Sequence, residues 1–273
     1  MLSHRIVTAL VLLPPFLAAV FLLPTAWFAA VIGLVVMLGV REWLPMIGLH
    51  RASVVWAVMG LLAGLMALVA GSVQAGVVTP AVLLAGAAWW LLAPLLLWHY
   101  SRHAGQVRPM GPGVGLVVGL LLLLPSWTAL VWLHGQAAGP WLVLLLFLMT
   151  WMADVGAYFA GRRFGRHRLA PAISPGKTWE GFTGGVLLAL LSAVPLWHLV
   201  SLDAVPLGFF LLLVLVAIVY SVVGDLFESM VKRRAGLKDS GALLPGHGGV
   251  LDRIDSITAS ATIFAAGLFW LWL

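Results

Sequence analysis

The chain has 273 residues, of which 63% are hydrophobic and only 9% are charged, and its mean hydropathy is +1.10. Soluble domains are about 45–50% apolar and about 25% charged, so the composition excludes a water-soluble globule and also a disordered chain. The chain has no cysteine, which excludes disulfide frameworks and cysteine-based metal sites, and its formal net charge is +6.

Nine apolar segments are long enough to cross, or nearly cross, a ~30 Å hydrocarbon core as helices. In chain order they are 6–23, 26–40, 53–73, 77–98, 113–133, 140–160, 181–200, 205–224 and 256–273. The first two are separated at Leu23-Pro24-Thr25, and they form either two spans or a re-entrant hairpin. We therefore expect an all-α, polytopic integral membrane protein with about nine transmembrane helices.

The basic residues all fall on one side of this arrangement. All 15 Lys and Arg lie in the N-terminal segment or in the loops 41–52, 99–112, 161–180 and 225–255, whereas Asp203 is the only charge in the opposite loops. Lys and Arg in short loops mark the cytoplasmic face. This predicts a cytoplasmic N-terminus and a C-terminus on the other side of the membrane.

The acidic residues divide the chain into two regions. Residues 1–140 contain one carboxylate, Glu42, and residues 141–273 contain the other eight. Carboxylates at a membrane edge are costly and usually functional. We expect 1–140 to be an N-terminal transmembrane region of about five spans, and 141–273 to be the catalytic transmembrane region with the cytoplasmic loops 161–180 and 225–255.

The loop 161–180 contains Ser174-Pro175-Gly176-Lys177-Thr178 just before a predicted helix. A hydroxyl, a glycine and an ammonium in a stiff turn suit a phosphate near a helix N-terminus. The motif is not a P-loop, because Pro171 stands where the first glycine would be. The arginines of this loop have an alternative explanation, because basic loops orient membrane proteins and attract anionic lipids.

The loop 225–255 pairs its carboxylates at helical spacing. Asp225, Glu228 and Ser229 stand at i, i+3 and i+4, and Asp252 and Asp255 repeat the i, i+3 spacing. Two carboxylate pairs on converging helix ends predict a hard cation, with Mg²⁺ the natural choice because it takes one or two carboxylates plus substrate phosphates.

Basic residues alternate with these carboxylates: Lys232, Arg233, Lys238 and Arg253. This mixture suits a metal–triphosphate group, in which cations face phosphate oxygens and carboxylates hold the metal. The alternative is a solvated amphipathic helix with ion pairs such as Glu228–Lys232.

Two isolated groups have two interpretations each. Asp154, late in the sixth apolar segment, needs a partner and is either part of a substrate or metal site or one half of a structural ion pair. His247 precedes Gly248-Gly249, which suggests close approach of the backbone to a ligand, although a single histidine can equally be structural.

Residues 229–255 resemble the signature of the phosphatidate cytidylyltransferase (CDP-diacylglycerol synthase) family. The matching positions are Ser229, Lys232, Arg233, Lys238, Asp239, His247, Gly248, Gly249, Asp252, Arg253 and Asp255. Residues 154–181 resemble the second conserved block of the family. Before residue 150 the resemblance is confined to Arg5 with Thr8 and to Arg41-Glu42-Trp43.

The resemblance implies transfer of the cytidylyl group of CTP to phosphatidate, which gives CDP-diacylglycerol and pyrophosphate. It implies Mg²⁺, with a K⁺ ion beside it, and a homodimer in the bacterial inner membrane with its active site on the cytoplasmic side. It implies no nucleic-acid partner. The metal positions carried over are Asp225 and Asp252, with Asp255 close by, and Lys177 joins them as a catalytic candidate. The candidate substrate-binding residues are Ser174, Lys177, Ser229, Lys232, Arg233, Lys238, Asp239, His247 and Arg253.

Three other functions were considered. An ion-coupled transporter would need buried carboxylates near the midplane and an inverted repeat, and the sequence has neither. A lipid-binding scaffold would not need paired carboxylates. Another membrane nucleotidyl- or phosphotransferase is the nearest alternative, but the D-G-x-x-A-R pattern of CDP-alcohol phosphotransferases is missing.

Overall fold

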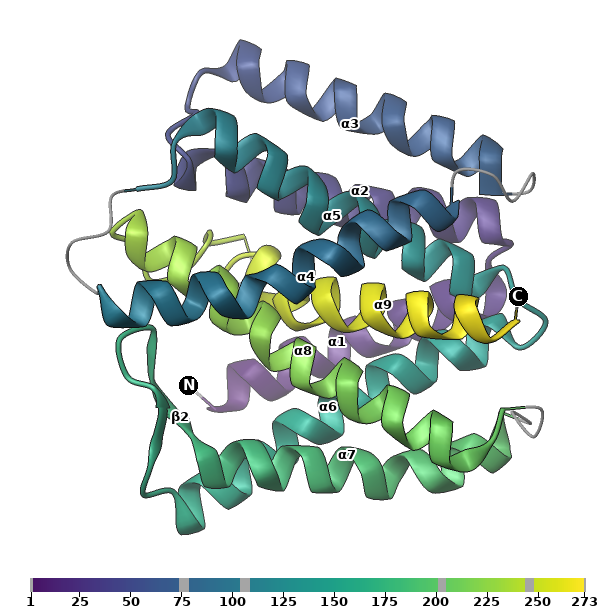
Figure 1. Cartoon of the computed structure of the whole chain (residues 1–273). Coiled ribbons are helices and arrows are strands. Elements are labelled where there is room, and N and C mark those ends of the chain that lie inside the picture. Colours follow the sequence, from purple (N-terminus) through teal and green to yellow (C-terminus); the bar gives the residue numbers. More distant parts are fainter. Residues whose placement is uncertain (1, 74–78, 104–108, 201–204, 244–247, 273) are drawn as a thin grey trace.

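The computed structural model describes residues 2–73, 79–103, 109–200, 205–243 and 248–272. These residues form nine helices and one β-hairpin (Figure 1). In chain order the elements are α1 (Leu2–Leu22), α2 (Thr25–Met46), α3 (Ala52–Val73), α4 (Thr79–Arg102), α5 (Pro112–His134), α6 (Gly139–Phe164), β1 (Arg168–Ala170), β2 (Ser174–Thr178), α7 (Trp179–Leu199), α8 (Leu207–Arg234) and α9 (Leu251–Trp272).

The all-α membrane fold is confirmed. Within the described residues, the eight helices from α2 to α9 are long and apolar enough to cross a membrane, and α1 contributes the shorter apolar helix Val11–Leu22. Helices suit the bilayer because they satisfy every backbone hydrogen bond within the segment. For the first two segments, two membrane spans and a re-entrant hairpin stay the two alternative predictions.

The helix α9 lies in the middle of the bundle and packs on α8, α5, α4, α6 and α2. Figure 1 shows α3 and α7 at opposite edges, and it shows α1 and α9 starting at the same end of the bundle. The buried apolar residues form two clusters, and each contains residues from both sides of residue 140, so the two predicted regions pack against each other. Their division at that residue stays a prediction.

Several helix boundaries differ from the predicted spans, and the largest differences, in α2, α8 and α9, fall on charged sequence. Helix α2 continues past residue 40 to Met46. Helix α8 continues past residue 224 to Arg234, and α9 starts at Leu251 rather than at 256. The hydrophobic criterion ended these spans where the first charged residues appear, yet the backbone remains helical. As a result, Asp225, Asp252 and Asp255 all lie on helices rather than in a loop.

The sequence predicted helices alone, and the structure adds one element, the β-hairpin between α6 and α7. Strand β1 pairs antiparallel with β2, and Arg168 lies opposite Thr178. The segment around Lys177, predicted as a turn, is therefore strand β2. The hairpin passes directly into α7, because the Thr178 side chain caps that helix by accepting a hydrogen bond from Gly181 N at 3.1 Å.

Helices α6 and α7 approach until their backbones touch. A Cβ atom added at Gly156 of α6 would lie 2.5 Å from the carbonyl oxygen of Gly184, and one added at Gly185 of α7 would lie 2.6 Å from that of Ala153. Small residues allow such approach between membrane helices. The Gly181/Gly185 spacing thus serves packing within the chain.

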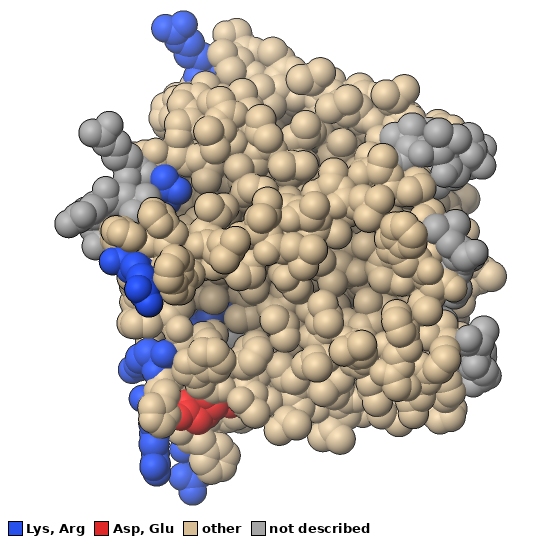
Figure 2. Space-filling view, in the orientation of Figure 1, with Lys and Arg blue, Asp and Glu red and all other residues tan. Residues whose placement is uncertain are grey.

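Charged side chains gather at one end of the bundle. Figure 2 shows Lys and Arg along the edge where the hairpin lies, and the broad face between the two ends carries other residues. This distribution agrees with the predicted separation of basic and uncharged loops. That this end faces the cytoplasm stays a prediction.

The α6–α7 contact gives the first testable prediction. Gly156→Ala should destabilise the protein by roughly 1–3 kcal/mol, because the added methyl group overlaps the backbone of α7. The matched control is Gly64→Ala in α3, where nothing lies within 4 Å of an added Cβ. Thermal unfolding in detergent micelles measures both, and equal midpoints for the two variants would contradict the proposed backbone contact.

Candidate active site

A cavity of about 390 Å³ lies between α6, α7, α8 and the hairpin. Its charged lining residues are Arg162 and the three residues Asp154, Lys177 and Asp225, which we call the cavity group. The remaining wall includes the apolar side chains Leu169, Phe182, Val186, Ile218 and Val222. A cavity with charged groups on one part and apolar groups on another suits a ligand with the same division.

The cavity group is joined by an ion pair from the hairpin to α8. Lys177 Nζ lies 2.7 Å from Asp225 Oδ2, and Ser229 Oγ donates a hydrogen bond to Asp225 Oδ1 at 3.3 Å. The Lys177 and Asp225 side chains are 26% and 31% exposed. Both groups are therefore accessible to a ligand that enters the cavity.

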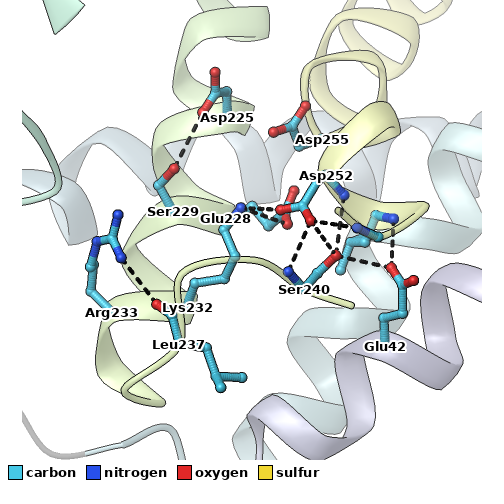
Figure 3. Close-up of polar contacts among 12 residues, drawn as sticks. Glu42, Asp225, Glu228, Ser229, Lys232, Arg233, Leu237, Ser240, Asp252 and Asp255 are labelled. Carbon is cyan, nitrogen blue, oxygen red and sulfur yellow. Dashed lines mark hydrogen bonds and ion pairs between the residues drawn. The ribbon is translucent and has the colours of Figure 1, made fainter. Parts of the chain in front are cut away.

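Asp255 of α9 lies next to this group, because α8 and α9 touch at Gly224. A Cβ atom added there would lie 2.6 Å from the Asp255 carbonyl oxygen. Figure 3 shows Asp225 and Asp255 near each other on the two helices. The Asp255 carboxylate is within electrostatic range of Asp225 and Lys177, and its Oδ1 accepts a hydrogen bond from Ser256 N at 2.6 Å.

A second group of charges is almost completely buried. Lys232 lies between two carboxylates: its Nζ donates to Asp252 Oδ1 and is 3.2 Å from Glu228 Oε1 (Figure 3). The three side chains, which we call the ion triad, are only 6–9% exposed. A buried charge without a partner is strongly destabilising, so these contacts hold α8 and α9 together.

Asp252 has donors on both carboxylate oxygens. In addition to the Lys232 contact on Oδ1, its Oδ2 accepts hydrogen bonds from Ser240 N at 2.9 Å, Gly249 N at 2.8 Å and Ser240 Oγ at 3.0 Å. The family resemblance gave Asp225 and Asp252 as metal positions, and that role of Asp252 stays a prediction. The structure surrounds Asp252 with donors from its own chain, and Asp255 is the α9 carboxylate beside the cavity group.

The sequence interpretation gave no role to Glu42 of α2, which reaches the same place. Its Oε1 accepts a hydrogen bond from Val250 N at 3.0 Å, and its Oε2 accepts one from Leu251 N at 2.8 Å. The hints in the sequence were that Glu42 is the one carboxylate in residues 1–140 and that Arg41-Glu42-Trp43 resembles the family. Nothing in the sequence pointed to its partners, which lie more than two hundred residues further along the chain.

Arg233 has contacts different from the predicted phosphate contact. Its Nε donates to the Ile173 carbonyl oxygen at 3.4 Å, and its Nη1 donates to the Leu237 carbonyl oxygen at 3.1 Å. The side chain therefore ties the end of α8 to the hairpin that carries Lys177.

The other predicted substrate-binding residues that the structure describes take no part in the contacts above, although Arg253 is within electrostatic range of Asp154. Ser174 is partly exposed on β2, and Lys238, Asp239 and Arg253 are exposed. His247 lies outside the described residues.

The balance of acidic and basic side chains at the site bears on whether it suits the predicted Mg²⁺. Five carboxylates lie in this region with two lysines and two arginines. The carboxylates are Asp154, Asp225, Glu228, Asp252 and Asp255, and the basic residues are Lys177, Lys232, Arg162, which lines the cavity, and Arg253, which is within electrostatic range of Asp154. Within the described structure, Glu228 Oε1 has the Lys232 ammonium at 3.2 Å, and Oε2 has no hydrogen-bond partner. Surplus negative charge on oxygen donors fits a hard divalent cation.

No group of three or more His, Asp or Glu among the described residues is close enough to hold an ion alone. Mg²⁺ usually takes only one or two carboxylates and completes its shell with water and substrate phosphates, so the donor set is still compatible with it. Magnesium binding therefore stays a prediction.

Comparison with known proteins places the whole chain in one group. Residues 3–271 match the model of the cytidylyltransferase family. A phosphatidate cytidylyltransferase of Pseudomonas aeruginosa is 45% identical over 270 residues, which cover 99% of this chain and 97% of that protein. A phosphatidate cytidylyltransferase of Haemophilus influenzae is 37% identical over 287 residues, which cover 99% of each chain.

The ion triad gives a prediction about stability. Lys232→Met should destabilise the protein by roughly 3–5 kcal/mol, because it leaves Glu228 and Asp252 buried without a counter-charge. Lys238→Met, at an exposed position nearby, should change stability by less than about 0.5 kcal/mol. Denaturation of both variants in the same detergent measures the difference, and a small effect at Lys232 would show that the triad does not hold the two helices.

Proposed function

Because this chain belongs to the cytidylyltransferase family, we propose that it transfers the cytidylyl group of CTP to phosphatidate and releases pyrophosphate. CDP-diacylglycerol synthesis, a step of phospholipid biosynthesis, is thus its function. The observation that carries it is similarity over essentially the full chain to two phosphatidate cytidylyltransferases. The cavity between the membrane helices supports it, because the lipid substrate also has a charged and an apolar part.

In the reaction, a phosphate oxygen of phosphatidate forms a bond to the α-phosphorus of CTP. The bond from that phosphorus to the bridging oxygen breaks, and pyrophosphate leaves with the electron pair. Both reactants are polyanions, so neutralising their charge and aligning them are the main catalytic tasks. A phosphate monoester is already mostly ionised near pH 7, because its second pKa is about 6, so a strong general base is not required.

Lys177 is the residue best placed to bind a phosphate. It lies at the polar part of the cavity on β2, and its ammonium is paired with the partly exposed Asp225. A phosphate group can therefore approach the same ammonium from the cavity. The apolar wall formed by residues such as Phe182 and Val186 would contact the lipid part of phosphatidate.

We assign the magnesium site to Asp225 and Asp255, with Asp154 beside them in the cavity group. When bound, the ion would neutralise phosphate charge and stabilise the leaving pyrophosphate. Asp252 would have to exchange its Lys232 contact to reach an ion, so its proposed task is to fix the start of α9. A K⁺ ion and a homodimer remain further proposals from the family resemblance.

The proposed location is the bacterial inner membrane, with the cavity facing the cytoplasm. The support is the collection of Lys and Arg at the end of the bundle where Lys177 and the hairpin lie (Figure 2), since such residues mark the cytoplasmic face. CTP then arrives from water, and phosphatidate enters from the bilayer. The transporter alternative is not favoured, because the carboxylates gather at that end.

The activity prediction concerns the cavity group. Purified protein should release pyrophosphate from CTP only when both Mg²⁺ and phosphatidate are present. Asp225→Asn should lower kcat roughly 100-fold or more, because it removes a negative oxygen donor from the centre of the site.

Asp203→Asn is the matched control for Asp225→Asn. It removes a carboxylate from a segment that the sequence places on the opposite face and that lies outside the described residues. Its kcat should stay within about twofold of the unmodified protein, since changes away from the site usually have small effects. Full activity of Asp225→Asn would refute the proposed role, and CTP turnover without phosphatidate would refute the proposed acceptor.

The orientation prediction uses the absence of native cysteine. In intact bacterial cells, Arg166→Cys at the exposed start of the hairpin should be protected from a membrane-impermeant maleimide. Ala137→Cys, exposed between α5 and α6, should react with it. After the cells are opened both should react, and the reverse pattern in intact cells would invert the proposed topology.

A further inference from the structure

We infer that Glu42 is a positioning residue of the active site, which holds the start of α9 and thereby the carboxylates that α9 carries. The catalytic consequence rests on the proposed function. The contacts of Glu42 with the start of α9, which we call the clamp, are given by the structure alone. Glu42 comes from α2, in the region of the chain for which the sequence gave no catalytic task.

Glu42 acts as the cap of a helix that is distant in sequence. The first N–H groups of a helix have no partner inside it, and an acidic side chain near them is stabilising. In α9 this need is met by Glu42, which accepts hydrogen bonds from Val250 N at 3.0 Å and Leu251 N at 2.8 Å. A carboxylate supplies both acceptors, whereas an amide would turn a donor toward one of these N–H groups.

The surrounding chain leaves space for this carboxylate. A Cβ atom added at Gly241 would lie 2.5 Å from Glu42 Oε1, and one added at Gly249 would overlap both Glu42 Oε2 and Ser240 Oγ. Two glycines on different turns of the chain therefore border the same carboxylate. The contact is enclosed on several sides and is not an incidental meeting of surface groups.

Ser240 joins Glu42 directly to Asp252. Its Oγ lies 2.9 Å from Glu42 Oε2 and 3.0 Å from Asp252 Oδ2, and it accepts a hydrogen bond from Asp252 N at 3.3 Å (Figure 3). Asp255 follows one helical turn later. Any shift of the first turn of α9 therefore moves Asp252 and changes the place of Asp255 beside the cavity group.

The helix that carries Glu42 is itself held firmly. The neighbouring Trp43 is buried, and its indole Nε1 donates to the Gly115 carbonyl oxygen of α5 at 2.9 Å. Gly39 lies one turn earlier on α2, where an added Cβ would be 3.5 Å from Leu251 and Ile254 of α9. The Glu42 carboxylate is therefore fixed relative to the bundle core and can hold α9 in one place.

The test compares Glu42→Gln with Arg41→Gln, a change at the exposed preceding residue of the same helix, and with Glu42→Asp. Full-length protein is purified in detergent with phosphatidate. Amide hydrogen exchange of Val250 and Leu251 should be about tenfold faster in Glu42→Gln, since a hydrogen bond to a charged acceptor is lost. Per folded molecule, kcat should fall at least about tenfold, and the Mg²⁺ concentration for half-activity should rise several-fold.

Arg41→Gln should match the unmodified protein in every readout, and Glu42→Asp should recover part of the lost activity. Unchanged exchange in Glu42→Gln would overturn the clamp. Faster exchange with an unchanged kcat and Mg²⁺ midpoint would show a purely structural tie and would overturn the positioning role. If the unmodified protein makes no CDP-diacylglycerol, the proposed function fails, whereas the exchange experiment still judges the clamp.

Should Glu42→Gln not fold, Ser240→Ala provides the second variant. It removes the bridge between Glu42 and Asp252 but leaves the backbone hydrogen bonds to both carboxylates in place. A several-fold lower kcat with a raised Mg²⁺ midpoint would support the positioning role, and unchanged values would overturn it.

Discussion

The structure depends on how carboxylates are compensated where helices leave an apolar core. A charge taken out of water costs several kcal/mol unless partners surround it, so each acidic residue at this end restricts the elements around it. Asp252 alone draws together α8 through Lys232 and the preceding segment through Ser240 and Gly249. Together with the close backbone contact at Gly224, these bonds fix the start of α9 against α8.

The same requirement separates two kinds of acidic residue. The carboxylate oxygens of Asp252 and Glu42 accept hydrogen bonds from the chain, so these two residues hold backbone segments in place. Asp225 has one lysine and one serine hydroxyl and is open to the cavity. Carboxylates of both kinds lie at neighbouring helix ends, so the fully hydrogen-bonded ones can hold the accessible ones in place. A reaction between two polyanions benefits from such preorganisation, because groups that are already aligned need not reorganise during the reaction.

The sequence was informative wherever the cause of structure is local. Long uncharged segments predicted the helices. The i, i+3 spacing paired Asp225 with Glu228 and Asp252 with Asp255, whereas the structure brings Glu228 and Asp252 together around Lys232 and places Asp255 within electrostatic range of Asp225. The hairpin was missed because Ser174-Pro175-Gly176-Lys177 has no alternation of apolar and polar residues, and its strand pairing depends on the fixed ends of α6 and α7. Glu42 was missed for a related reason: its partners Val250 and Leu251 are adjacent only after the bundle has formed. Spacing also could not distinguish the occupied Asp252 from the accessible Asp225.

The backbone contact between α6 and α7 has a consequence for how the cavity admits a lipid. Where Gly156 meets Gly184 there are no side chains to change rotamer, so these two walls behave as one stiff unit. Any widening of the cavity therefore has to come from movement of α8 or from bending of the hairpin. If the cavity holds phosphatidate as proposed, the width available to the lipid is then set by the positions of whole elements more than by rotamers along the α6–α7 contact.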